Sequence, residues 1–61
     1  MATRIRRLRQ ARFLTQVELA KKARVHPISL VRIETGAATP RVTTLRRLAK
    51  ALCVDVAELV S

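Results

Sequence analysis

The sequence predicts an all-α fold of five short helices, and three observations lead to this prediction. Aliphatic residues are abundant and Phe13 is the only aromatic residue, so the core has to be aliphatic, as in a small helical bundle. Apolar residues recur at helical spacing, most clearly between residues 42 and 52. Residue pairs that cap helices precede two of the predicted helices. With 61 residues, the chain has room for one domain, residues 1–61, and for no second one.

The first helix is predicted over residues 3–12. Ile5 and Leu8 fall on one face of it, and most of its other positions hold arginine. The second helix begins at Thr15, because Thr15 and Glu18 have the spacing of a capping box. In such a box, a hydroxyl and a carboxylate accept hydrogen bonds from amides that a helix start leaves unpaired.

A tight turn and a third helix follow the second helix. Arg24 and Val25 make the turn, and His26 and Pro27 start the third helix. Proline suits the first helical position, where its missing N–H costs nothing. Residues 15–36 are therefore predicted to form two short helices joined by a turn.

Two further helices complete the prediction. Pro40 marks the start of the fourth helix, and residues 42–52 provide its apolar face. Asp55 begins a short fifth helix, with Glu58 at the spacing of a second capping box. The fifth helix is more apolar than its size needs, which indicates either closure of the core or a dimer seam. The apolar residues concerned are Val56, Leu59 and Val60.

Three segments occur in a register that is typical of one family. They are Thr-Gln-Val-Glu-Leu-Ala at 15–20, Arg-Ile-Glu-Thr-Gly at 32–36 and Leu-Ala-Lys-Ala-Leu at 48–52. With them, the chain from Ile5 to Val60 resembles the phage Cro/repressor-type (Xre-like) helix-turn-helix regulators of transcription. The resemblance implies a lambda-repressor-like domain, in which the second and third helices read DNA and the other three pack behind them.

The resemblance also implies which residues meet double-stranded DNA. The N-terminal part of the third helix enters the major groove, while the second helix crosses the backbone. Arg32 is the one long donor there that can reach a guanine as a fork, and Ile28 can contact a thymine methyl group. We therefore expect a large electrostatic share of binding and an A·T preference at one position. The implied reading positions are Pro27, Ile28, Ser29, Val31 and Arg32.

Other positions carry over as backbone contacts or as structural residues. Gln16 matches the glutamine that clamps a phosphate, Thr35 and Gly36 match a loop that grips phosphate, and Arg41 matches a basic residue over the minor groove. His26 takes the cap position of the third helix. The same resemblance implies an ion pair of Arg9 with Glu34, which would fix the first helix to the third. The alternative is that Arg9 is one more solvated charge.

Three positions depart from the family, which usually has glycine there to end a helix in the left-handed conformation. They hold Phe13, Arg24 and Cys53, and only Gly36 is retained. Other residues adopt that conformation at a cost of roughly 1–2 kcal/mol each. The departures predict either turns of another shape or a domain that carries strain.

The composition limits the classes of function. Thirteen Lys and Arg against four Asp and Glu give a net charge of +9, which attracts nucleic acid first and anionic membranes second. The alternative is that these charges only keep the domain soluble. His26, Cys53 and Asp55 are each the only residue of their kind, and no metal-ligand spacing or phosphate loop occurs. We expect no enzyme, no metal, no cofactor and no internal disulfide.

The expected function is sequence-specific binding of double-stranded DNA in transcription regulation, as a repressor that binds an inverted repeat as a homodimer. One alternative is a protein-interaction module, such as an antitoxin that binds a toxin, with Pro27, Ile28 and Val31 as its apolar patch. A cationic peptide acting on membranes is a weaker alternative. Without a membrane span or signal peptide, we expect a cytoplasmic protein, prokaryotic or phage-encoded and associated with the nucleoid.

Overall fold

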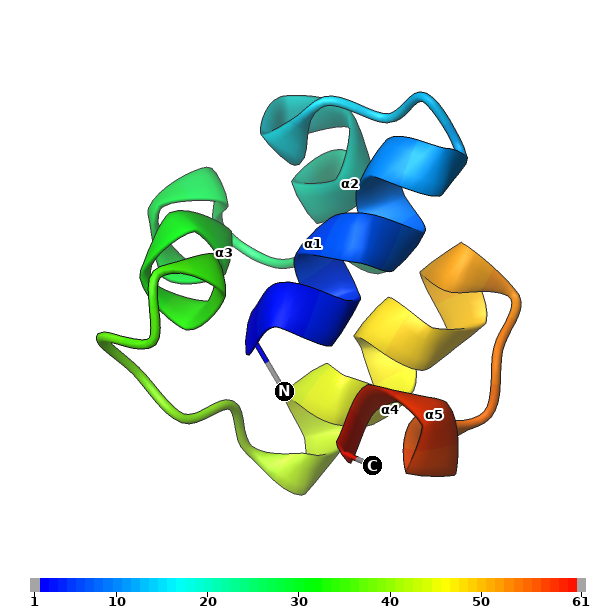
Figure 1. Cartoon of the computed structure of the whole chain (residues 1–61). Coiled ribbons are helices and arrows are strands. Elements are labelled where there is room, and N and C mark those ends of the chain that lie inside the picture. The colour runs from blue at the N-terminus through cyan, green and yellow to red at the C-terminus, as the bar shows by residue number, and fades with distance from the viewer. Residues whose placement is uncertain (1, 61) are drawn as a thin grey trace.

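The computed structural model describes residues 2–60, and all secondary structure in them is helical. The prediction of an all-α fold with five helices is confirmed (Figure 1). The first helix begins and ends one residue earlier than predicted. The predicted domain ends, residues 1 and 61, lie outside the described residues. The helices are α1 (Ala2–Ala11), α2 (Gln16–Ala23), α3 (Pro27–Glu34), α4 (Val42–Leu52) and α5 (Val56–Val60).

The helices are arranged so that α3 lies at one side of the molecule (Figure 1). Helix α2 packs against α3 and α4, α1 packs against α3 and α5, and α4 also packs against α5. The loop at residues 35–41 connects α3 to the start of α4 along that side. Helix α3 is therefore supported from behind by α1 and α2, which leaves its other face open.

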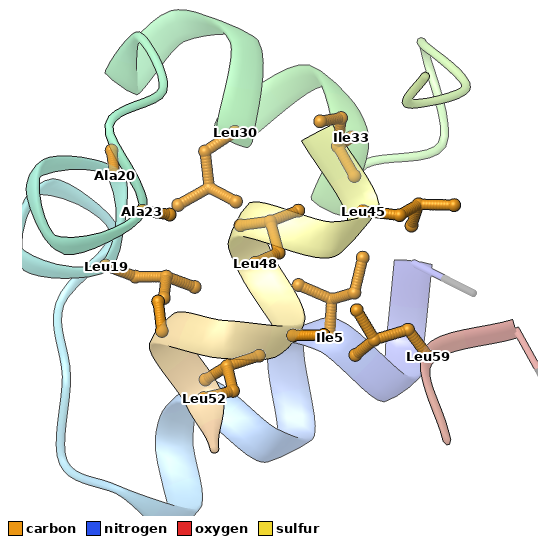
Figure 2. Packing of buried hydrophobic residues seen from close by; sticks show 12 residues of the cluster. Ile5, Leu19, Ala20, Ala23, Leu30, Ile33, Leu45, Leu48, Leu52 and Leu59 are labelled. Carbon is orange, nitrogen blue, oxygen red and sulfur yellow. The ribbon is translucent and has the colours of Figure 1, made fainter. Parts of the chain in front are cut away.

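The core is aliphatic, and side chains from all five helices converge in it (Figure 2). Helix α4 contributes most to it, as the apolar spacing between residues 42 and 52 predicts. From α5, Leu59 is fully buried and Val56 packs against the core, whereas Val60 is half exposed. Two of the three residues Val56, Leu59 and Val60 therefore close the core. The buried apolar residues are Ile5, Leu19, Ala20, Ala23, Leu30, Ile33, Leu45, Leu48, Ala49, Ala51, Leu52 and Leu59.

Side chains cap the starts of the two helices that carry the motif. At α2, the Glu18 amide donates to Thr15 Oγ1 at 3.0 Å, and the Thr15 amide donates to Glu18 Oε1 at 2.8 Å. The hydrogen bond from the Thr15 amide holds the pKa of Glu18 below its ordinary value of 4.5. At α3, His26 Nδ1 accepts from the Ile28 amide at 3.2 Å, and Pro27 takes the first helical position.

The predicted capping box of α5 is only half formed. The Asp55 amide donates to Glu58 Oε2 at 3.2 Å, which is one of its two hydrogen bonds. The Glu58 amide donates to the main-chain carbonyl of Asp55 at 3.0 Å instead of to its side chain. A main-chain acceptor three residues back competes with the Asp55 carboxylate for the same amide, because the first turn of this short helix is tight.

Helices α1 to α4 all end with the same hydrogen bond, in which an amide beyond the helix reaches a carbonyl five residues back. The bond joins the Leu14 amide to Arg9, the Val25 amide to Ala20, the Ala37 amide to Arg32 and the Val54 amide to Ala49, at 2.8–3.2 Å. Three of these donor residues pack their side chains against the core, which is usual for this motif. They are Leu14, Val25 and Val54.

The residue before each of these donors is left-handed, whether or not it is glycine. Gly36 has φ 80°, and Phe13, Arg24 and Cys53 have φ 55°, 58° and 58°. The turns thus keep their shape without glycine, and three helix ends carry the conformational cost. The Phe13 side chain is 92% exposed, so little packing offsets that cost.

One ion pair joins α1 to α3. Arg9 donates from Nε to Glu34 Oε2 at 2.8 Å and from Nη2 to Glu34 Oε1 at 3.1 Å, in a two-pronged arrangement. Its third donor, Nη1, reaches the Leu14 carbonyl at 2.8 Å. The Arg9 and Glu34 side chains are 11% and 2% exposed, so both charges are largely removed from water. Each charge therefore depends on the other for compensation.

We predict that Glu34→Ala lowers the free energy of unfolding by about 3–5 kcal/mol, because it leaves the Arg9 guanidinium buried without its carboxylate. Thermal unfolding followed by circular dichroism measures the loss. The double variant Arg9→Ala/Glu34→Ala should be less destabilised than the sum of the two single variants. Additive losses would show that the two side chains do not stabilise each other.

We also predict that Phe13→Gly and Cys53→Gly each raise the free energy of unfolding by about 1 kcal/mol. Removing the left-handed penalty gains roughly 1–2 kcal/mol, and the greater freedom of glycine in the unfolded chain offsets about 0.5–1 kcal/mol of that. Urea titration measures the change. Lys22→Gly, at an exposed helical position of α2, should have the opposite sign. Lower stability of both variants at the helix ends would contradict the prediction.

Candidate nucleic-acid interface

The open face of α3 holds all five residues that the sequence places at reading positions. Leu30, Ile33 and Glu34 point into the molecule and are buried, which fixes the rotation of the helix about its axis. The opposite face is exposed, with the Ile28 side chain 64% exposed at its N-terminal end. The exposed residues on it are Pro27, Ile28, Ser29, Val31 and Arg32.

A groove of about 510 Å³ lies beside this face, between α3, the loop after it and α4. Four arginines line the groove, and Ser29, Thr39 and Thr44 add hydroxyl groups. No carboxylate belongs to its lining. The groove brings three of the predicted contact residues together, namely Ser29, Arg32 and Arg41, and its arginines are Arg24, Arg32, Arg41 and Arg47.

A second hollow, of about 420 Å³, lies where α1, the start of α2 and the end of α3 meet. It brings together the predicted phosphate contacts Gln16 and Thr35 and adds the exposed Arg6. Gln16 is half-buried, and its Nε2 donates to Glu34 Oε1 at 3.3 Å, so the carboxylate of the ion pair orients this amide. One N–H of the Gln16 side chain is thus used within the protein, and the other remains for a ligand.

The loop after α3 begins with two ordered residues. Thr35 Oγ1 donates to the Arg32 carbonyl at 3.1 Å, which uses its hydrogen at the end of α3 and leaves its lone pairs. Gly36 is exposed and left-handed, and nothing lies within 4 Å of the place where a side chain would begin. Glycine is favoured here by the backbone conformation and not by a lack of space for a side chain.

The charges of the domain are distributed unevenly. The Glu34 carboxylate is engaged by Arg9, Glu18 caps the start of α2, and Asp55 and Glu58 lie at the start of α5. The groove beside α3 therefore carries positive charge that no carboxylate in its lining offsets. Arrays of unpaired arginines and hydroxyls of this kind bind phosphates.

Sequence reasoning missed three cations that line the two hollows, namely Arg6, Arg24 and Arg47. The sequence predicts Arg24 in the turn after the second helix, at a position where the family usually has glycine, and it predicts no DNA contact for Arg24 or Arg47. A signal for Arg47 exists in the sequence, because Arg41, Thr44 and Arg47 recur every three residues and share one side of α4. Arg6 has no such local signal.

Residues 2–60 were also compared with the requirements of a metal site and of a membrane-spanning helix. No three of their His, Cys, Asp and Glu side chains are placed to hold a metal ion. Cys53 is exposed at the end of α4. None of the described helices has the length and apolar character that crossing a membrane requires.

Comparison with known proteins identifies a family for the chain. A family model described as a helix-turn-helix domain matches residues 1–60, which include all five helices. Neither the curated proteins nor the solved structures that were compared with the chain gave a match. The family is one of DNA-binding domains and is typically non-enzymatic. Because the family model matches nearly the whole length of the chain, the chain belongs to the helix-turn-helix domain family.

Proposed function

We propose that this protein is a Cro/repressor-type regulator of transcription that binds double-stranded DNA sequence-specifically through the major groove. The observation that carries the proposal is the open face of α3, which lies beside a groove lined by four arginines and no carboxylate. An α-helix fits the major groove, and cations beside it meet the phosphates that border the groove. Repression then follows from occupying a promoter.

Base reading would rest on few side chains. Arg32 is the long donor on the open face and can give two hydrogen bonds to a guanine. Ser29 can donate to a base or a phosphate. Ile28 offers an apolar contact to a thymine methyl group, and Pro27 and Val31 provide shape without hydrogen bonds.

The remaining predicted contacts would position the domain on the backbone. Gln16 has a free amide hydrogen at the start of α2, where the helix dipole also favours an anion. Thr35 and Gly36 present the exposed start of the loop, and Arg41 extends the positive surface towards α4. Contacts of this kind fix orientation but carry no sequence information.

We propose further that the protein acts as a homodimer on an inverted repeat. A domain of 61 residues buries only about 60% of the surface that its unfolded chain exposes, so association would add stability. Val60 of α5 and Val42 at the start of α4 are half exposed or more and could take part in the contact. Two copies of α3 would then lie about 34 Å apart, in successive major grooves. Sedimentation that gives a monomer both free and on DNA would contradict the dimer.

A second candidate function is that of a protein-binding module, such as an antitoxin. The observation that favours it is the apolar tip of α3, where Ile28 is 64% exposed and neighbours the exposed Pro27 and Val31. An apolar tip of this kind fits a protein surface as well as a thymine methyl group. Cytoplasmic location and a prokaryotic or phage origin follow from either function and belong to the proposal.

The experiment that tests the proposal is selection from a random duplex library with the full chain, washed at low and then moderate salt. We expect enrichment of an inverted repeat with half-site centres about one helical turn apart. Retention at low salt without enrichment, followed by release at moderate salt, would indicate binding by charge alone. Sequence specificity would then have to come from a partner, as in the second candidate function.

We predict that Arg32→Ala weakens binding to the selected duplex by about 1–3 kcal/mol and relaxes the preference at one base position. Titration of fluorescent duplexes that carry each of the four bases at that position measures both effects. Arg46→Ala is the matched control, because Arg46 is exposed on α4 and lies outside the linings of the hollows beside α3. Equal weakening on all four duplexes would make Arg32 a phosphate contact.

A further inference from the structure

A cluster of three cations lies at the end of the groove beside α3, outside the reading positions. We name it the Arg24 cluster, and it consists of Arg24, Arg47 and Lys50. Together with Ala23, these residues line a hollow of about 430 Å³, and Arg24 and Arg47 also line the groove of about 510 Å³. The two hollows thus form one continuous surface that begins at α3 and ends between α2 and α4.

The fold brings these charges together without neutralising them. Arg47 Nη1 donates to the main-chain carbonyl of Arg24 at 3.5 Å, which places the two residues next to each other. All three side chains are exposed, and in residues 2–60 none of them forms an ion pair with a carboxylate. Neighbouring like charges repel, so this arrangement opposes folding slightly and favours an anionic ligand.

The backbone of Arg24 adds an independent observation. Arg24 ends α2 with φ 58° and ψ 41°, and Cys53 ends α4 with the same two angles. Both amides also donate to equivalent carbonyls in the last turn of their helices. Glycine would adopt this conformation without strain, and the exposed Arg24 side chain adds no packing to the core. Folding alone therefore does not favour arginine over glycine at this position.

The dimensions of the domain allow a duplex to reach the Arg24 cluster. Helix α3 has eight residues and spans about 12 Å. The domain extends over 23 × 23 × 19 Å, so it overhangs the base pairs that α3 covers. A duplex carries one phosphate charge for about every 1.7 Å of its axis, so backbone charge continues beyond those base pairs.

We propose that the Arg24 cluster binds backbone phosphates of the duplex outside the base pairs that α3 reads, and that Arg24 gains this contact at the expense of domain stability. The inference rests on the proposed DNA binding. The surface between α2 and α4 would then be a further contact with the DNA backbone, in addition to those of Gln16 and the loop after α3. With this contact, the domain would bind a longer segment of the duplex than α2 and α3 cover.

The test compares Arg24→Gly with Cys53→Gly, two substitutions at backbone positions of the same geometry. Both variants should melt at a higher temperature than the original chain. Binding to the selected duplex, extended at both ends, is then measured at about 50 mM and about 200 mM salt. For Arg24→Gly, we expect weaker binding at the lower concentration and a ratio of the two Kd values that is about three- to fourfold smaller, since one phosphate contact contributes about 0.9 to the salt slope.

Cys53→Gly should leave both Kd values unchanged. Arg47→Gln should reduce the salt dependence like Arg24→Gly, while Arg46→Gln on the same helix should reduce it less. The difference between Arg24→Gly and the original chain should also disappear on a duplex trimmed to the base pairs under α3.

Three outcomes would overturn the inference. They are equal salt dependence of Arg24→Gly and Cys53→Gly, a difference that persists on the trimmed duplex, and an effect of Arg46→Gln as large as that of Arg47→Gln. Failure of the proposed function looks different, because the original chain would then enrich no sequence from the random library, whether or not it retains duplex at low salt.

Discussion

The ion pair of Arg9 and Glu34 is the contact on which the proposed DNA-facing side of this domain depends. One guanidinium joins α1 to the end of α3 and, through the Leu14 carbonyl, to the turn before α2. The same carboxylate orients Gln16 at the start of α2. Because both charges are nearly removed from water, other positions of these groups would leave a charge uncompensated. The pair thereby specifies how α3 and the start of α2 lie relative to each other.

Local signals in the sequence predicted most of the fold. Helices α2 and α3 begin where the capping residues predict, at Thr15 with Glu18 and at His26 with Pro27. These starts were predictable because a cap depends only on residues a few positions away. The rotation of α3 was also predictable, since its buried residues recur at helical spacing. Asp55 failed as a full capping box, because a main-chain carbonyl took the amide that its side chain would have bound.

The groove beside α3 could not be predicted in the same way. It requires α4 to lie against the turn between α2 and α3, and Arg24 and Arg47 are 23 residues apart in the chain. No local pattern fixes a contact over that distance. Nor could the sequence decide whether Phe13, Arg24 and Cys53 change their turns, because a distorted turn and a strained residue cost similar amounts. In the structure, each of these three turns is left-handed and is followed by a partly buried apolar residue that packs against the core.

The left-handed residues at three helix ends affect how readily this domain can acquire a new binding preference. Substitutions on a recognition helix usually cost stability, and a domain of this size has little to lose. In this domain, glycine at the left-handed helix ends would raise the free energy of unfolding without changing the shape of the turns or the core. Replacing a residue there could compensate for a harmful exchange on α3 while leaving the aliphatic interior untouched. Two of the three ends, at Phe13 and Cys53, line none of the hollows beside α3, so a gain of stability there would not disturb the proposed DNA contacts.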